Sequence, residues 1–208
     1  NAMFNYAIML HKADGIKCNK KEAEKYYKMA IDKGNLKAFY CYAVMLFRGD
    51  GIQQNKKKAI EYFKKAADGG HKNAMFEYGM ILMKGDEILQ NKEEASKYLK
   101  KAADEGQIES MFNYGLMLIK GDGIPQNKEE ASKYLKKSAD KGDVDSIFSY
   151  YLNVKKGNGI NSNDEEANKY FNQAIDKCYK VTKSSEEISK LFNKEQKVEF
   201  EIYFLYNS

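Results

Sequence analysis

The sequence is poor in the residues that build disulfide frameworks, metal sites and phosphate-reading surfaces. Its 208 residues include three cysteines, two histidines, one proline and no tryptophan. An odd number of cysteines without C-x-x-C spacing argues against a disulfide framework or a zinc site. Proline is costly inside helices, so its scarcity suits an all-helical protein. Arg48 is the only arginine, and specific nucleic-acid binding is not expected because such recognition usually relies on arginine forks.

Long apolar runs are also missing. No segment reaches the roughly 18 apolar residues that a membrane span needs, and no signal-peptide pattern is present. The sequence therefore predicts a cytoplasmic protein in a reducing compartment, without membrane attachment. Hydrophobic residues still make up 43% of the chain, so a core can be buried. The positive charge is almost all lysine, which is interpreted as a solvated surface.

What the sequence does contain is one motif repeated every 36 residues. The first position is small in each copy: Ala2, Ala38, Ala74, Ser110 and Ser146. Four residues later stand Tyr6, Tyr42, Tyr78, Tyr114 and Tyr150. A second small residue recurs at Ala23, Ala59, Ala95, Ala131 and Ala167, followed by a second tyrosine at Tyr26, Tyr62, Tyr98, Tyr134 and Tyr170. This agreement within one chain predicts five tandem units, at about 2–37, 38–73, 74–109, 110–145 and 146–180.

Each unit is predicted to be a hairpin of two helices. In the second copy the helices are expected over roughly residues 38–48 and 56–68. The Gly-Asp-Gly-Ile segment between them, at 49–52 and again at 121–124, supplies glycines that can end a helix at positive φ. The third copy has Glu87 in place of the second glycine, which predicts a strained or reshaped turn. The second helix of each of the first four units is expected to end at a glycine: Gly34, Gly70, Gly106 and Gly142.

A recurring asparagine is predicted to cap the second helix of each unit, at Asn19, Asn55, Asn91, Asn127 and Asn163. Glutamate three residues later predicts capping boxes with Glu22, Glu94, Glu130 and Glu166. The second copy has Lys58 there, so its box is expected to be incomplete. One hairpin cannot bury its apolar faces alone. We therefore expect an all-α fold, a right-handed superhelix or solenoid of five stacked hairpins with a concave side.

These residues resemble a known family, the Sel-one-like repeat, which is related to the tetratricopeptide repeat. The resemblance rests on Tyr78-Gly79, Gly121-Asp122-Gly123, Ala131, Tyr134 and Ser138-Ala139, and it covers roughly residues 2–180. It implies a non-catalytic adaptor or scaffold for other proteins, without a cofactor. Some secreted bacterial members tie each hairpin with a disulfide, and the cysteine pairs for that are missing here.

The relationship to tetratricopeptide arrays implies that partners bind along the face made by the first helices. Register transfer places this face at four positions of each unit. In the second to fifth units the third position is Tyr40, Phe76, Phe112 and Phe148, and the seventh is Val44, Met80, Leu116 and Leu152. The tenth is Phe47, Met83, Ile119 and Lys155, with His11 in the first unit, and the eleventh is Arg48, Lys84, Lys120 and Lys156. This groove would suit peptide segments with apolar anchors and acidic flanks.

Two alternatives stand beside this hypothesis. Neighbouring first helices also touch each other, so the third and seventh positions could belong to the core, and the lysine row could be an ordinary solvated edge. The chain could also be a regulatory or targeting module cut from a larger signalling enzyme, such as a protein kinase.

Catalytic chemistry is not expected. His11 and His71 lie in different units at different repeat positions, so no catalytic or metal-binding pair is predicted; His71 stands where a first-helix cap belongs. Cys41 has apolar neighbours and is interpreted as a small buried hydrophobe rather than a nucleophile. The Gly-Asp-Gly turns lack the Lys-Ser/Thr of a phosphate loop.

The two ends depart from the repeat. Residues 181–208 break the period, and their spacing predicts a capping helix, although alternation over 198–206 leaves a strand open. The amino end starts inside a first helix without a cap. We therefore expect Met3, Ala7 and Leu10 to face empty space, which favours a fragment of a longer protein and self-association through this end.

Overall fold

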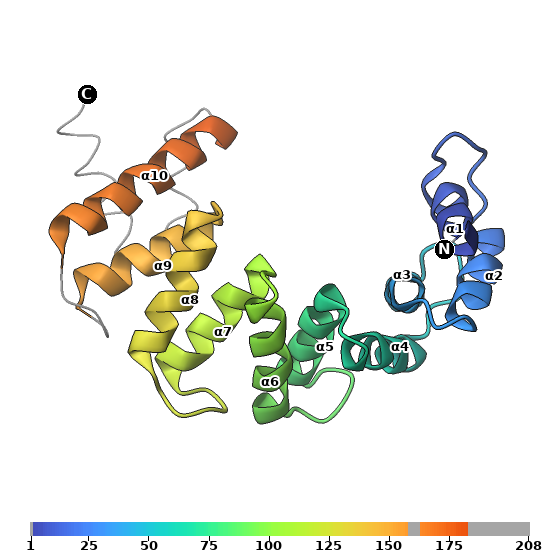
Figure 1. Ribbon diagram of the computed structural model, residues 1–208, viewed down its shortest axis with the longest axis horizontal. Coiled ribbons are helices and arrows are strands. Elements are labelled where there is room, and N and C mark those ends of the chain that lie inside the picture. The colour runs from blue at the N-terminus through green and yellow to red at the C-terminus, as the bar shows by residue number, and fades with distance from the viewer. Residues whose placement is uncertain (1, 158–162, 183–208) are drawn as a thin grey trace. The chain divides into compact units, whose positions relative to one another are not determined.

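The computed structural model describes residues 2–157 and 163–182, and every regular element in those ranges is an α-helix (Figure 1). In chain order the helices are α1 (Ala2–Lys12), α2 (Lys20–Ile31), α3 (Leu36–Arg48), α4 (Lys56–Asp68), α5 (Lys72–Lys84), α6 (Lys92–Asp104), α7 (Ile108–Lys120), α8 (Lys128–Asp140), α9 (Val144–Lys155) and α10 (Asp164–Thr182). The all-α prediction is confirmed. The expected capping segment lies outside the described residues from 183 onward, as does the choice between helix and strand at 198–206.

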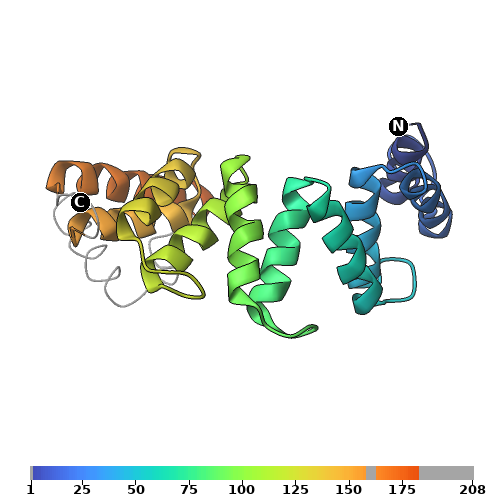
Figure 2. The ribbon, with the colours of Figure 1, turned by 60° about the horizontal axis from the view of Figure 1, so that its bottom comes forward.

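The helices belong to two compact units. The first unit, Asn1–Gln126, contains α1 to α7, and each of these helices packs on the next one along the chain. Figure 1 and Figure 2 show this for α5 and α6, which lie side by side as an antiparallel pair. In the second unit, Asn127–Ser208, α8 packs on α9 and α9 packs on α10.

The helix bounds agree with the predicted hairpin, with one shift. Helix α4 spans the expected residues, and α3 ends at Arg48, where Gly49 takes up the left-handed conformation with φ of +70°. Helix α3 begins two residues before Ala38, because Asn35 is its cap. The Asn35 side-chain oxygen accepts a hydrogen bond from the Ala38 N–H at 3.0 Å, so the first turn precedes the small residue.

The asparagine caps of the second helices are confirmed, but the predicted capping boxes are not complete, because the glutamate does not accept from the backbone N–H of the asparagine. The Asn19 side chain accepts from the Glu22 N–H at 3.1 Å, as predicted. The Asn19 backbone N–H donates instead to the carbonyl of Leu10 in the preceding helix, at 2.9 Å. Glu22 therefore contacts the Asn19 side-chain amide, at 3.0 Å. Asn91 repeats this arrangement, so the cap residue ties both helices of a hairpin together.

The Gly-Asp-Gly turn also joins one hairpin to the previous one. A Cβ atom on Gly51, which has φ of +73°, would lie 2.4 Å from Cδ of Lys20. Lys20 pairs with Asp50 in the same turn, and the next-but-one turn repeats the pair with 2.7 Å between Lys92 and Asp122.

The third copy keeps this ion pair in a different form. Glu87 replaces the second glycine of the turn and itself pairs with Lys56 at 2.5 Å. In the described ranges the one residue other than glycine with positive φ is Ala13, so Glu87 does not adopt the glycine conformation. Of the two alternatives that the sequence predicted for this turn, a strained or a reshaped backbone, the structure shows the reshaped one.

Small residues and tyrosines fill the space between the helices, as expected. Ala23, Ala59 and Ala95 have no exposed surface. The two recurring tyrosines meet edge to face, with ring centroids 4.7–5.2 Å apart, in the pairs Tyr6–Tyr26, Tyr42–Tyr62, Tyr78–Tyr98 and Tyr150–Tyr170. Aromatic pairs of this geometry add about 0.5–1.5 kcal/mol to the stabilisation that burial provides.

A recurring lysine of the solvated surface also connects successive hairpins. The amino group lies 5.1–5.5 Å from the ring centre of a tyrosine in the next first helix. The pairs are Lys28–Tyr42, Lys64–Tyr78, Lys100–Tyr114 and Lys136–Tyr150. Three of these lysines also pair with an acidic side chain: Lys28 with Glu24 at 2.7 Å, Lys64 with Asp68 at 3.1 Å and Lys136 with Glu166 at 2.5 Å.

The expectation for the amino end is also wrong for two of its three residues. Ala7 is fully buried and Leu10 is 4% exposed. Helix α2 folds back on α1 and its side chains, Ala23 and Tyr27 among them, share the core with Ala7 and Leu10. These residues therefore do not face empty space, and self-association stays a prediction without that argument.

Candidate partner-binding face

In the first unit, the positions predicted for partner binding keep part of their surface open to solvent. Helices α3, α5 and α7 bury one side, as α3 does with Tyr42, Met45 and Leu46. The predicted apolar positions are half-buried, namely Tyr40, Phe76, Phe112, Val44, Met80, Leu116, Phe47, Met83 and Ile119. The eleventh positions, Arg48, Lys84 and Lys120, are exposed. We call this set of twelve residues the binding face.

The second unit does not continue the aromatic row. Phe148 is 6% exposed, so its ring offers almost no surface to a partner. This residue must be removed from the predicted site. Leu152 is half-buried and Lys156 is exposed, as their counterparts in the first unit are.

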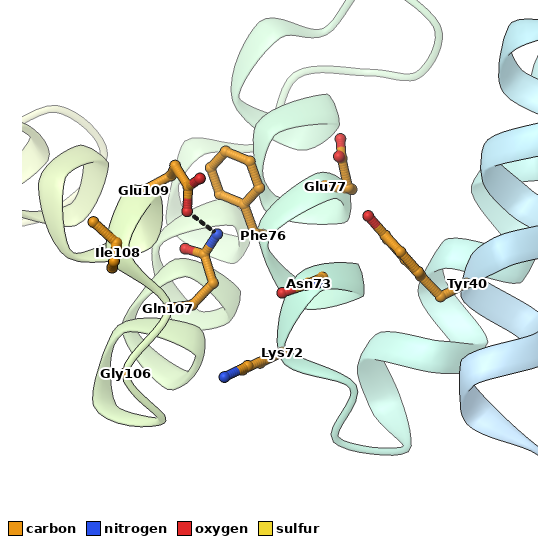
Figure 3. A pocket seen from close by; sticks show the side chains of 9 residues that line it. All are labelled: Tyr40, Lys72, Asn73, Phe76, Glu77, Gly106, Gln107, Ile108 and Glu109. Atoms are coloured by element: carbon orange, nitrogen blue, oxygen red, sulfur yellow. Dashed lines mark hydrogen bonds between the residues drawn. The ribbon is translucent and has the colours of Figure 1, made fainter. Parts of the chain in front are cut away.

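Two of the predicted aromatic residues line a pocket of about 310 Å³. Tyr40 comes from α3 and Phe76 from α5, and the wall is completed by Lys72, Asn73, Glu77, Gly106, Gln107, Ile108 and Glu109. Figure 3 shows the Phe76 ring between Glu109 and Glu77, with Tyr40 beside Glu77 and Lys72 lower in the view. We call it the acidic pocket, because it brings two carboxylates next to two aromatic rings.

Contacts behind the pocket fix the Tyr40 ring. His71 stacks on it with centroids 4.8 Å apart and an angle of 22°, and Phe63 lies 6.0 Å away. His71 is the cap of α5, as predicted, because its Nδ1 atom accepts a hydrogen bond from the Ala74 N–H at 3.3 Å. Burial lowers the pKa of His71, which favours the neutral imidazole that this hydrogen bond requires.

The two carboxylates of the pocket differ in their surroundings. Burial raises the pKa of Glu77; Arg48 and Lys84 oppose that rise, and the charge of Glu109 adds to it. In the described part of the chain, Glu77 makes no hydrogen bond or ion pair. Glu109 is held in place by the Gln107 side chain, which donates to its Oε2 atom at 2.6 Å.

Sequence reasoning missed both carboxylates, because neither belongs to the repeat. The position of Glu77 is occupied in the other units by Asn5, Cys41, Asn113 and Ser149, so the 36-residue period carries no signal for it. Glu109 lies in the first turn of α7, where an acidic residue is already explained by the helix dipole. The proximity of the two glutamates could be found only from the packing of α5 against its neighbours.

A second pocket, of about 410 Å³, brings together four residues of the binding face. Met83 and Leu116 form its apolar part, and Lys84 and Lys120 stand at its edge. Asp86, Gln90, Lys92, Asn113, Met117 and Asp122 complete the lining. We call it the basic pocket. Lys84 and Lys120 thus stand beside apolar side chains in a lining that also contains Asp86 and Asp122, and the predicted groove with a positive edge stays a prediction.

His11, which stands at a tenth position, serves structure. Its Nε2 atom lies 2.8 Å from Oδ2 of Asp50, and its Nδ1 atom lies 3.1 Å from the Tyr27 hydroxyl. Both ring nitrogens are therefore engaged, and the imidazole links the first hairpin to the turn of the second.

The Cys41 side chain is half-buried rather than fully buried, and burial raises the pKa of its thiol. The reactive thiolate of a nucleophilic cysteine is therefore disfavoured. No group of three or more histidine, cysteine, aspartate or glutamate side chains that could hold a metal ion occurs in residues 2–157 and 163–182. No helix in those ranges is both long and apolar enough to cross a membrane.

Solved structures share this fold. A Sel1 repeat protein from Oxalobacter formigenes is 24% identical, with a TM-score of 0.76 over 85% of this chain and 70% of that one. A protective antigen of uropathogenic Escherichia coli with an SLR fold is 21% identical, with a TM-score of 0.81 over 96% of this chain and 43% of that one. An immunity protein of Pseudomonas aeruginosa is 18% identical, with a TM-score of 0.52 over 94% and 71%.

The sequence comparisons agree with the structural ones. Curated protein sequences contain no significant match. The family model for the Sel1 repeat, the Sel-one-like repeat named above, matches residues 1–35, 37–71, 72–107, 108–143 and 154–177. Proteins of this kind are all-α repeat superhelices that generally serve as non-catalytic modules for protein–protein interaction. With more than half of its residues matched, this chain belongs to the Sel1 repeat family.

Proposed function

We propose that this chain is a non-catalytic scaffold that holds segments of partner proteins on the binding face of α3, α5 and α7. The observation that carries the proposal is the row of half-buried apolar side chains, in register on three successive first helices, with a pocket at two places along it. The same face would serve a free-standing adaptor or a module within a larger enzyme.

The energetics favour a partner that spans several repeats. Full burial of a large apolar side chain contributes about 1.5–3 kcal/mol, and a half-buried side chain has only part of that left to gain. One position therefore cannot hold a partner against the entropy lost on association, whereas several can. The side chains of the face are already packed on one side, which restricts their rotamers and lowers the entropic cost of binding.

The basic pocket sets a charge preference for part of the partner. Lys84 and Lys120 are exposed beside Met83 and Leu116. An apolar anchor flanked by an acidic residue would cover the floor and meet the positive edge. We further propose a cytoplasmic setting, which the unpaired thiols of Cys18 and Cys41 suit.

The test compares partner capture by the wild-type chain and by a Phe76→Ala, Phe112→Ala variant. Proteins from the source cell are captured on each and quantified by mass spectrometry. A Lys97→Ala, Lys133→Ala variant is the control, because those two lysines are exposed on second helices in ion pairs within their own helix. We expect specific partners to be retained by the wild type and the control and lost by the phenylalanine variant.

Circular dichroism and thermal unfolding establish that each variant is folded before capture. Partners held equally by all three proteins would refute binding on this face.

A further inference from the structure

The acidic pocket differs in chemistry from the rest of the binding face. The predicted partner carries apolar anchors and acidic flanks, and that chemistry does not explain two carboxylates beside two aromatic rings. Glu77 and Glu109 stand within one pocket with Tyr40 and Phe76. An acidic side chain of a partner would be repelled here.

We propose that the acidic pocket receives a positively charged side chain, an arginine or lysine, from the partner segment that the binding face holds. The inference rests on the proposed function and adds the chemistry of one anchor. Glu77 and Glu109 would pair with the cationic group, and the Tyr40 and Phe76 rings would cover its aliphatic stem or stack on its charged end.

Three observations support this occupant. Glu77 is half-buried and makes no direct ion pair within the described residues, although Arg48 and Lys84 act on its charge, so a partner's cation would supply that direct pair. The Gln107 side chain keeps Glu109 at the pocket edge, since it donates to Glu109 while its oxygen caps α7 at Ser110. The volume of about 310 Å³ suits one long side chain rather than a folded element.

Competing occupants fit less well. The described residues offer no third carboxylate, histidine or cysteine with which the two glutamates could hold a metal ion. Lys72 also lines the pocket and would weaken the binding of a cation, but in Figure 3 its amino group lies apart from the carboxylates of Glu77 and Glu109. An anionic group that filled the pocket would face two carboxylates and only one amino group.

The two pockets together give the binding face a polarity. The acidic pocket includes Phe76 and Glu77 of α5, and the basic pocket includes Met83 and Lys84 of the same helix. Seven residues of helix separate these pairs, which is a rise of roughly 10 Å. A segment that fills both pockets would carry a basic and an acidic side chain about 10 Å apart, a spacing of three residues in an extended peptide.

The probe is N-acetyl-arginine amide, titrated into the full ¹⁵N-labelled chain and followed by NMR. N-acetyl-glutamate amide and N-acetyl-leucine amide serve as probes of the same backbone with a different side chain. We expect the arginine probe to shift the backbone amides of Phe76, Gly106 and Glu109 in a saturable manner, and the glutamate probe to leave them unchanged.

Variants then assign the binding to the pocket. Glu77→Gln should weaken the arginine probe by about fivefold, as the loss of one partly desolvated charge pair predicts. Glu61→Gln removes the same charge from the exposed surface of α4 and should bind as the wild type does. Equal binding by the wild type and Glu77→Gln, or equal shifts from the glutamate probe, would overturn the proposal.

The failure of this inference can be told apart from the failure of the proposed function. If the phenylalanine variant loses its partners while the arginine probe does not bind, the scaffold function stands and the cation pocket falls. If the arginine probe binds at Glu77 but the phenylalanine variant captures partners as well as the wild type does, the scaffold proposal is refuted. The pocket would then bind a cation, but not one carried by a partner on the binding face.

Discussion

The rings of Tyr78 and Tyr98 meet almost at right angles, with centroids 5.0 Å apart and an angle of 88°. The Tyr98 hydroxyl donates to Asp68 of the preceding hairpin at 2.5 Å. Lys64, which pairs with the same Asp68 at 3.1 Å, lies over the Tyr78 ring at 5.5 Å. One aromatic pair thus stabilises its own hairpin and the junction with the hairpin before it.

A double-mutant cycle measures how strongly this pair is coupled. Tyr78→Leu and Tyr98→Leu keep apolar bulk and remove the ring contact. We expect the double variant to be about 0.5–1.5 kcal/mol more stable than the sum of the two single effects predicts. The free energy of unfolding in urea is the measurement. Tyr6→Leu combined with Tyr98→Leu is the control, since these residues belong to different pairs and should be additive. Additivity in the Tyr78–Tyr98 cycle would contradict a specific ring contact.

The tyrosine pairs could be anticipated, because their signal is the repeat itself. Tyr78 and Tyr98 recur at fixed positions in every unit, and a position that repeats is one that every hairpin requires. The same holds for the asparagine caps and the turn glycines. The first-helix positions Tyr40 and Phe76 are predicted by the register of the related tetratricopeptide arrays rather than by the period alone.

Features that belong to one copy could not be found in this way. Glu77 and Glu109 create the acidic pocket, yet the period predicts nothing at either position. Phe148 follows the repeat perfectly and is nevertheless buried, because burial depends on the neighbours of the last hairpin rather than on the motif. The role of Lys64 was missed for another reason: a lysine at a repeated exposed position has the same sequence signature whether or not a ring lies beneath it.

Alanine substitutions at two glycines with the same φ angle distinguish the cost of backbone strain from the cost of a steric overlap. Gly34 and Gly51 both have φ of +73°, but a Cβ on Gly34 would meet no atom within 4 Å, whereas one on Gly51 would overlap the Lys20 side chain. We expect Gly34→Ala to cost about 1–2 kcal/mol of unfolding free energy, the cost of a left-handed alanine. Gly51→Ala should cost more, because Lys20 must also move away from Asp50. Equal losses of unfolding free energy in the two variants, measured by urea unfolding, would show that the Lys20 side chain can move aside without destabilising the protein.

His71 makes stability depend on pH. Its pKa in the folded chain is lower than the ordinary value of 6.5, so the unfolded chain binds the proton more readily. The stabilisation is therefore complete above pH 6.5 and is lost as the pH falls from there through the folded pKa. A protonated ring also cannot accept the Ala74 N–H. The loss should approach about 1 kcal/mol, the usual contribution of a helix cap.

The matched variant for this effect is His71→Asn, which installs the cap residue that α3 has at Asn35. Urea unfolding of both proteins at pH 7.5, 6.5 and 5.5 gives the comparison. The wild type should lose more stability over this range than the variant, because carboxylates titrate alike in both. Parallel curves would mean that His71 does not set the dependence.

The three cysteines allow a direct test of the view that Cys41 is not a nucleophile. In a Cys178→Ser background only Cys18, which is exposed, and Cys41, which is half-buried, remain. Each unit by which burial raises the pKa of the Cys41 thiol lowers its thiolate fraction about tenfold. We expect a fast and a slow phase in the reaction with an aromatic disulfide reagent at pH 8.

Removal of Cys18 by substitution with serine should abolish the fast phase alone. A fast reaction at Cys41 would instead indicate an activated thiol and reopen the question of catalysis.

The contacts between successive hairpins have a consequence for how such a chain changes its length. Lys28 meets Tyr42 and Lys64 meets Tyr78 at the same distance of 5.5 Å, so these joints share one cation–ring contact, although the acidic partner is Glu24 at the first and Asp68 at the second. A segment of one 36-residue period can therefore be duplicated or deleted, and the hairpins on either side of the change still meet through the same lysine–tyrosine contact. Gene duplication can therefore lengthen the array one unit at a time without inventing a new interface, and each inserted copy extends the surface on which a longer partner could lie.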